Sequence, residues 1–245
     1  MSKIEMVEHS DTVELLGYYG NDEVIACSAW TSTSRNLSED KKQRIPQLIK
    51  SLWKNGHETP FEKGVLHFLV NTNVAVHIQI IKHRIGVSVN AESARYKELK
   101  EDKYYLPPDW ENIENSKFSE TMSQIVGDYS ISPVDGCRKW LDILEWYTMS
   151  GNKLYHQCVE DLTPILGRKR AKESARFFKT YNSQIQADVM FNMRSFANFQ
   201  KLRNSDKAQL EIKDIAQQMI SLVENIPGNP FESTLQAWKE CGVYK

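Results

Sequence analysis

Residues 64–96 read GVLHFLVNTNVAVHIQIIKHRIGVSVNAESARY, and this stretch constrains the fold more than any other part of the chain. Its beginning, GVLHFLV, alternates apolar and polar side chains and predicts a half-buried strand. The following NVAVHIQIIKHR fits both the helical period and the strand period of two, and we favour a helix. A strand that leads directly into a helix indicates a mixed α and β unit.

The end of this stretch, KHRIGVSVNAESARY at residues 82–96, gathers an unusual number of potential cations. Lys82, His83, Arg84 and Arg95 stand among small and neutral residues. A packed strand or helix gains nothing from so many cations close together, because a buried charge without a partner is costly. The cluster therefore indicates an anion site.

The elements to either side are expected to be mostly helical. We expect a helix at 46–55, with Pro46 in its first turn and Gly56 as its stop. Another should follow Pro133 in CRKWLDILEWYTMSG, ended by Gly151, with its core-facing residues at Trp140, Ile143, Leu144 and Tyr147. The other expected elements are a short strand before Pro107 and Pro108, helices at 170–182, 194–204 and 206–226, and an extended segment at 186–193. Helix should exceed strand, in one α+β domain that spans residues 1–245.

Composition excludes several classes of protein. The 245 residues are 40 % hydrophobic, which suffices for one substantial core. With 31 basic and 32 acidic residues, no overall field favours nucleic acid or an anionic membrane. The apolar stretches are interrupted by polar residues, so we expect a soluble, cytoplasmic protein. The four cysteines are Cys27, Cys137, Cys158 and Cys241. They are far apart in the sequence and form no CxxC pair, which argues against a disulfide framework or a zinc site.

One arginine lies on an apolar helix face. In RSFANFQKLRN, Phe196, Phe199 and Arg203 are three and four residues apart and share a face. A buried guanidinium needs an anion or several acceptors. The plainer alternative is that Arg203 reaches solvent from the helix end or pairs with Asp206 or Glu211, and spacing by itself favours this alternative.

His83 and its neighbours allow a similar choice. A lone histidine is more often structural than catalytic, but the charges of Lys82 and Arg84 would lower the pKa of His83 and keep it neutral. Ser93 taken alone is a loop serine. The sequence contains no GxGxxG, GxxxxGK[ST] or HExxH pattern, so side chains would have to hold any bound nucleotide.

The stretch 82–96 resembles the signature of flavin-dependent thymidylate synthases, in which Arg-His-Arg is followed by seven residues, a serine and shortly an Arg-Tyr pair. Other segments resemble the family in order and distance. They are GHETPFE at 56–62, Gln79 ahead of the signature, KESARFF at 172–178, NMRSFANFQKLR at 192–203 and PFESTLQAW at 230–238. The resemblance covers the chain from about Asn21 to Trp238.

The resemblance implies a reaction and an assembly. The reaction is synthesis of dTMP from dUMP, with methylenetetrahydrofolate as carbon donor, FAD as hydride carrier and NADPH as reductant. No cysteine nucleophile is implied. The implied fold is a single α/β domain of the α+β type, with a mostly antiparallel central sheet packed by helices. It assembles as a homotetramer with active sites where subunits meet.

The resemblance also implies roles for individual residues. Those that face the flavin are Thr59, Lys82, His83, Arg84, Glu92, Asn192, Arg194 and Asn198. Those that face dUMP are Gln79, Ser93, Arg95, Arg176 and Arg203. Arg203 is the implied catalytic residue, because a guanidinium near the pyrimidine would stabilise negative charge on the ring during hydride transfer. Ser93 is a positioning residue.

The chain departs from the family pattern in three places. Lys82 stands where the family has arginine, which keeps the charge but loses the planar fork. Eight residues separate Arg84 from Ser93, so we expect a bulge or a shift in register, and Glu92 lies one residue closer to the serine than the family carboxylate. Residues 179–181, Lys-Thr-Tyr, replace a Leu-Pro pair, a change that we interpret as structural.

Two other functions compete with this interpretation. The chain could be a flavin-dependent enzyme that acts on another pyrimidine nucleotide, such as dCMP. It could also be a non-catalytic binder of nucleotides or single-stranded nucleic acid, using basic and aromatic residues. The near-neutral net charge weighs against the binder.

Overall fold

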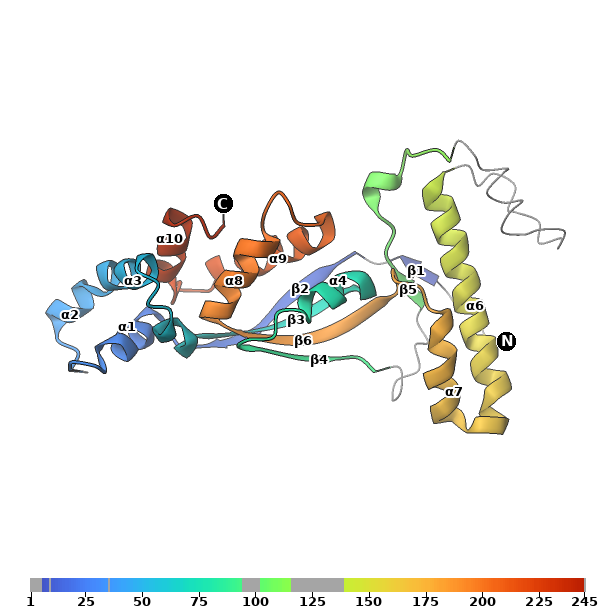
Figure 1. Ribbon diagram of the computed structural model, residues 1–245, viewed down its shortest axis with the longest axis horizontal. Coiled ribbons are helices and arrows are strands. Elements are labelled where there is room, and N and C mark those ends of the chain that lie inside the picture. Colours follow the sequence, from blue (N-terminus) through green and yellow to red (C-terminus); the bar gives the residue numbers. More distant parts are fainter. Residues whose placement is uncertain (1–5, 9, 35, 94–101, 116–138, 245) are drawn as a thin grey trace. The chain divides into compact units, whose positions relative to one another are not determined.

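The computed structural model of the chain describes residues 6–8, 10–34, 36–93, 102–115 and 139–244. They belong to two compact units (Figure 1). The first unit takes residues 1–10 and 92–184, and the second takes residues 11–91 and 185–245. Among the described residues, more lie in helices than in strands, as the sequence predicts.

The second unit is built on a four-stranded sheet. Its strands lie in the order β2 (Thr12–Tyr19), β3 (Val65–Asn73), β6 (Gln184–Asn192) and β4 (Val87–Ala91). The pairs β2–β3 and β4–β6 are antiparallel. Both β3 and β6 confirm predicted strands, and β3 alternates buried and half-buried side chains as its sequence indicates.

Three helices pack against this sheet: α4 (Val74–Ile80), α8 (Met193–Arg203) and α9 (Leu210–Glu224) (Figure 1). They confirm the helices predicted in these regions, although α9 begins four residues later than expected. Phe68 of β3, Phe191 of β6 and Phe196 of α8 are fully buried and form a ring cluster between sheet and helix. This core supports the turn that follows α4.

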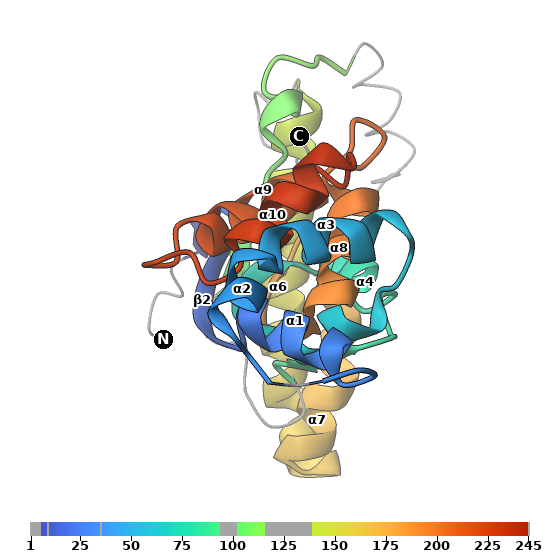
Figure 2. The same ribbon diagram turned by 90° about the vertical axis from the view of Figure 1, so that its left-hand side faces the viewer.

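Further helices gather at one end of the sheet (Figure 2). They are α1 (Asp22–Trp30), α2 (Glu39–Gln43), α3 (Ile45–Lys54) and α10 (Glu232–Glu240), with a short 3-10 helix at Thr59–Lys63. Helix α3 has Pro46 in its first turn and Gly56 just beyond its end, as predicted. Trp238 of α10 is fully buried, where its ring contacts those of Trp53 and Phe196.

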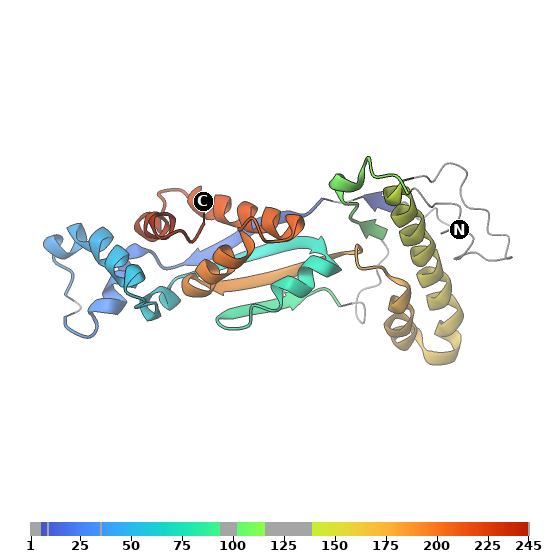
Figure 3. The same cartoon turned by 45° about the horizontal axis from the view of Figure 1, so that its top comes forward.

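The first unit is a helical hairpin with a small parallel strand pair. Helices α6 (Trp140–Leu166) and α7 (Arg168–Ala175) pack side by side, and a 3-10 helix, η3, follows at Arg176–Phe178 (Figure 3). Strands β1 (Met6–Glu8) and β5 (Asp102–Tyr104) pair in parallel, and a 3-10 turn follows at Pro108–Trp110. Strand β5 confirms the short strand predicted before Pro107.

The predicted end of α6 at Gly151 is wrong. The helix continues to Leu166, and the supposed core face is only partly buried: Ile143 and Leu144 are half-buried, whereas Trp140 is 40 % and Tyr147 is 59 % exposed. Gly151 serves close packing, because a β-carbon there would lie 2.5 Å from the carbonyl oxygen of Phe178. The buried stripe is instead Thr148, Gly151, Asn152, Tyr155 and Val159. The helix predicted at 170–182 also ends early, at Ala175.

No helix within the described ranges is long and apolar enough to cross a membrane. Cys27, Cys158 and Cys241 carry free thiols, and Cys137 lies outside the described residues. The described part of the chain also contains no group of three or more His, Cys, Asp or Glu that could hold a metal ion.

Candidate anion and nucleotide site

Three residues of the cation cluster, Lys82, His83 and Arg84, lie in the turn between α4 and β4. The amide of His83 donates to the carbonyl of Ile80 at 3.0 Å and closes the end of the helix. Gly86, with φ of +66°, then turns the chain into β4. Lys82 and Arg84 are exposed and His83 is half-buried. The turn thus directs two cations outward and one imidazole inward.

Arg203 extends from the end of α8 to this turn. Its Nε donates to Nε2 of His83 at 3.0 Å, and its Nη1 donates to Oε1 of Gln79 at 3.3 Å. The structure therefore brings together His83, which is expected to face the flavin, and Gln79 and Arg203, which are expected to face dUMP. Of the nearby carboxylates considered as alternative partners, Asp206 forms an ion pair with Lys213 at 2.8 Å.

Two neighbours fix the orientation of these partners. The ring of His83 meets that of Phe199 edge to face, with centroids 5.0 Å apart. Nε2 of Gln79 donates to Oε1 of Gln209, just before α9, at 2.6 Å. Because Gln209 accepts from the amide nitrogen, the amide oxygen of Gln79 is directed at Arg203. The guanidinium is held before any ligand arrives.

Burial, and secondly the positive charge of Arg203, lower the pKa of His83 below its ordinary value. The sequence correctly predicts a neutral imidazole, but its attribution to Lys82 and Arg84 is wrong. A guanidinium can only donate, so Nε2 of His83 accepts and the ring proton lies on Nδ1.

This arrangement predicts the titration of His83. In protein with 13C-labelled histidine, NMR should give a midpoint for His83 below the ordinary 6.5. In Arg203→Gln the midpoint should rise, because the neighbouring cation is gone. Between the lowered pKa and 6.5, the unfolded chain binds a proton that the folded chain does not, so stability should fall as the pH falls through this window. A midpoint above 6.5 in the parent protein would contradict the contact with Arg203.

Asn192 and Ser195 connect the same turn to the start of α8. Oδ1 of Asn192 caps the helix by accepting from the amide of Ser195 at 2.8 Å. The backbone amide of Asn192 donates to the backbone carbonyl of Gly86 at 3.0 Å, and the hydroxyl of Ser195 donates to the backbone carbonyl of Ile85 at 2.5 Å. The start of the helix therefore donates two hydrogen bonds to carbonyl groups of the turn.

Arg194 lies on the other face of α8, together with Asn198. Its guanidinium contacts Glu58 through Nε at 2.9 Å and Glu62 through Nη1 at 2.7 Å. Thr59 starts the 3-10 helix between these two carboxylates. A cavity of about 270 Å³ opens here, and its lining is Trp53, Glu58, Arg194, Ala197, Asn198, Lys201, Cys241, Gly242 and Val243.

The donors of these two faces suit an anionic dinucleotide such as FAD. Lys82 and Arg84 are exposed cations, and Asn198 adds an amide beside the cavity, where Arg194 is paired with Glu58 and Glu62. Positive charge and amide groups are what a pyrophosphate and a heterocycle require of a protein that lacks a glycine-rich loop. The cavity is large enough for a part of such a cofactor.

The remaining predicted residues lie elsewhere. Glu92, Ser93 and Arg176 belong to the first unit, where Arg176 is exposed at the start of η3. Arg95 lies outside the described residues. The predicted bulge is absent from β4, which pairs with β6 in continuous register from Val87 to Ala91.

Sequence reasoning did not single out Glu58, Ser195 or Gln209. Glu58 lies inside the segment GHETPFE and could have been suspected as a partner for a cation. Gln209 contacts a residue that is 130 positions away, and no local pattern indicates this.

Comparisons with known proteins identify relatives of this chain. The family described as "Thymidylate synthase complementing protein" matches residues 14–227. A flavin-dependent thymidylate synthase of Thermosipho africanus is 30 % identical over 225 residues, which cover 91 % of this chain and 90 % of that protein. Another, from Pseudothermotoga lettingae, is 28 % identical over 233 residues, 95 % of this chain and 94 % of that protein.

The fold also matches solved structures. The UMP/dUMP methylase PolB of Streptomyces cacaoi, bound with 5-Br UMP, superposes with a TM-score of 0.71 at 20 % identity and covers 98 % of this chain and 99 % of that one. The same enzyme bound with 5-Br dUMP gives a TM-score of 0.66 at 23 % identity, over 95 % and 96 % of the two chains.

Proposed function

The chain belongs to the flavin-dependent thymidylate synthase family, and we therefore propose that it converts dUMP to dTMP by reductive methylation. FAD is its cofactor, with NADPH and methylenetetrahydrofolate as co-substrates. The observation that best supports the proposal is the guanidinium of Arg203, which His83 and Gln79 hold at the end of an otherwise apolar stripe.

We assign the two faces of α8 to different ligands. The face with Arg194 and Asn198, which borders the cavity, and the cations of the turn between α4 and β4 would hold FAD, which supplies the hydride when bound. The face with Arg203 and Gln79 would hold dUMP. The full flavin set is Thr59, Lys82, His83, Arg84, Glu92, Asn192, Arg194 and Asn198, and the full dUMP set is Gln79, Ser93, Arg95, Arg176 and Arg203.

The chemistry assigned to Arg203 is electrostatic. Negative charge develops on the pyrimidine ring when hydride reaches C6, and a cation already in place stabilises it without reorganisation. The neutral imidazole of His83 accepts from Nε of Arg203 and Gln79 accepts from Nη1, so that Nη2 would face the ring. Lys82 contributes charge without the bidentate geometry of arginine.

The proposal extends to the assembly. We propose that residues 1–245 act as one domain of this family, because the matched region of the family spans both compact units. We also propose a homotetramer with active sites where subunits meet, as the family resemblance implies, and a cytoplasmic location, where NADPH and folates are present.

The test is the absorbance of the purified protein in the near-ultraviolet and visible range, before and after anaerobic addition of NADPH and dUMP. Flavin bands that bleach on reduction, followed by dTMP formation when methylenetetrahydrofolate is added, are the expected result. A colourless protein that cannot be reconstituted with FAD would contradict the proposal. In that case, strongly salt-dependent oligonucleotide binding would favour the non-catalytic binder.

The same assay identifies the substrate. The fold is shared with a methylase named for both UMP and dUMP, so the products from dUMP, UMP and dCMP should be compared. Preferential methylation of dUMP is expected. Preference for another pyrimidine nucleotide would support the divergent enzyme instead.

A further inference from the structure

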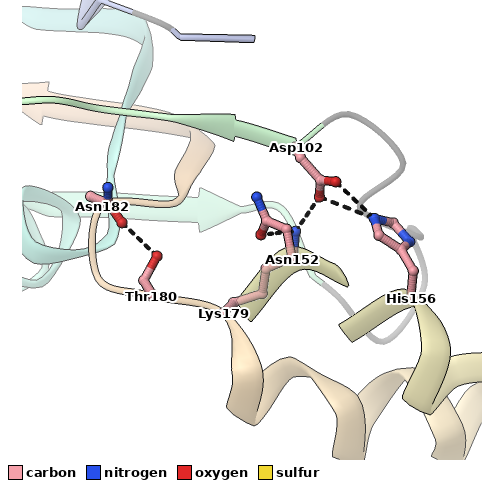
Figure 4. Close-up of polar contacts among 6 residues, drawn as sticks. All are labelled: Asp102, Asn152, His156, Lys179, Thr180 and Asn182. Carbon is pink, nitrogen blue, oxygen red and sulfur yellow. Dashed lines mark hydrogen bonds and ion pairs between the residues drawn. The ribbon is translucent and has the colours of Figure 1, made fainter. Parts of the chain in front are cut away.

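Four polar side chains of the first unit form a buried cluster, which we call the polar clamp: Asp102, Asn152, His156 and Lys179 (Figure 4). Nζ of Lys179 lies 2.5 Å from Oδ1 of Asp102 and donates to Oδ1 of Asn152 at 2.8 Å. Nε2 of His156 lies 2.9 Å from Oδ2 of Asp102. The clamp connects β5, two successive turns of α6 and the segment after η3.

The clamp is costly to bury. The side chain of Asp102 is 1 % exposed and that of Lys179 is 10 % exposed. Burial lowers the pKa of Lys179, and the contact with Asp102 opposes this effect. Nζ of Lys179 also lies 4.7 Å from the ring centroid of Tyr155, so the amine is enclosed on several sides. Buried ion pairs add little net stability, whereas they can fix one geometry.

What the clamp fixes is the short helix that carries Arg176. Lys179 directly follows η3, and its amide donates to the carbonyl of Arg176 at 3.0 Å. Gly151 of α6 leaves room for the carbonyl of Phe178. Before η3, Ala175 is fully buried against Tyr155 and Val159. The backbone of η3 is thus held at both ends, while the side chain of Arg176 is exposed.

We propose that the polar clamp positions Arg176 for dUMP, and that Lys179 is a positioning residue of the reaction. The inference rests on the proposed function, because the role of Arg176 as a dUMP ligand belongs to it. Lys179 need not touch the nucleotide. It acts by fixing the backbone from which the guanidinium of Arg176 extends, since orientation of a binding group governs its contribution.

The inference predicts that Lys179 matters only through Arg176. Lys179→Met keeps the length of the side chain and removes its charge. In this variant the Kd for dUMP should rise by about tenfold, which lies within the range of interaction energies found between residues in contact. KM for dUMP should rise with Kd. At saturating dUMP, kcat should stay within about twofold of the parent value, because the lost interaction binds the substrate and the transition state equally.

A double-mutant cycle tests this prediction. The Kd for dUMP is measured by calorimetry on FAD-loaded protein for the parent, Lys179→Met, Arg176→Ala and the double variant. In the Arg176→Ala background the lysine substitution should leave the Kd unchanged, since there is no guanidinium left to orient. An equal rise in both backgrounds would overturn the inference, because it would show a general structural role.

Two further variants guard against simple destabilisation. Asn152→Ala removes one acceptor from Lys179 and leaves the ion pair in place, so it should shift the Kd in the same direction by a smaller factor. Tyr104→Phe removes a hydrogen bond of 3.0 Å to Oε1 of Glu145 in the same unit without touching the clamp or η3, and its Kd should match that of the parent even if its Tm falls. A rise in Kd for Tyr104→Phe as large as that for Lys179→Met would refute the assignment.

The outcomes separate this inference from the proposed function. If the parent protein neither binds nor methylates dUMP, the proposed function fails. If the parent does both and Arg176→Ala binds dUMP as tightly as the parent, the proposed reaction stands, whereas the assignment of Arg176 to dUMP and the inference about the clamp fail.

Discussion

Arg203→Ala should lower kcat for dTMP formation by roughly 100- to 1,000-fold, the usual effect of removing one preorganised group that stabilises charge in a transition state. The side chain is held by His83 and Gln79 at 3.0 and 3.3 Å, so no other cation of α8 can take its place without a rearrangement. Lys201 lines the cavity on the other face with Arg194. The quantity to measure is single-turnover formation of dTMP by the reduced, FAD-loaded enzyme at saturating dUMP.

Two variants sharpen this prediction. Arg203→Lys keeps the charge but cannot reproduce both contacts, so it should recover only a part of the rate. Lys207→Ala removes an exposed cation that is only four residues away, and its kcat should stay within about twofold of the parent. If Arg203→Ala retains most of the parent rate while Tm and flavin content are normal, Arg203 is not the catalytic cation.

The sequence predicts the elements around this site because periodicity is a local signal. The spacing of Phe196, Phe199 and Arg203 correctly places the arginine on the apolar stripe of α8, and alternation correctly identifies β3. Where a glycine is concerned, local signals mislead. A glycine at position 151 is typical of the end of a helix. In the folded chain, however, Gly151 lies inside the helix and lets the backbone carbonyl of Phe178 pack closely against it, and this contact exists only in the folded chain.

The partners within the site are long-range and could not be predicted from local patterns. His83 and Arg203 are 120 residues apart, and Arg194 meets Glu58 across 136. Spacing favours Asp206 or Glu211 as partners of Arg203, because nearby carboxylates are the default choice for a cation. The fold overrides this choice by placing the α4 turn beside the end of α8. The polar clamp likewise could not be predicted from the sequence, because its residues come from β5, α6 and the segment after η3, which are far apart along the chain.

Gly86→Ala should break the connection between the turn and α8, with a loss of roughly 2–4 kcal/mol in unfolding free energy and a marked loss of flavin affinity. Two effects add. The residue has φ of +66°, where a side chain is strained. A β-carbon would also overlap with Nδ2 of Asn192 and with Oγ of Ser195. Both side chains must move, and with them the cap of α8 and a proposed flavin ligand.

Gly228→Ala isolates the first effect, because Gly228 has φ of +74° and a β-carbon added there would meet no neighbouring atom within 4 Å. It should lose only about 1–2 kcal/mol in chemical denaturation and keep the parent Kd for FAD. The difference between the two variants then measures the clash with Asn192 and Ser195. Equal losses of unfolding free energy in the two variants, with unchanged flavin affinity, would mean that the turn tolerates the methyl group and that the position of the Asn192 side chain does not depend on Gly86. A larger loss for Gly86→Ala, together with weakened FAD binding, would show that one glycine aligns the cation turn with the helix that carries Arg194 and Arg203.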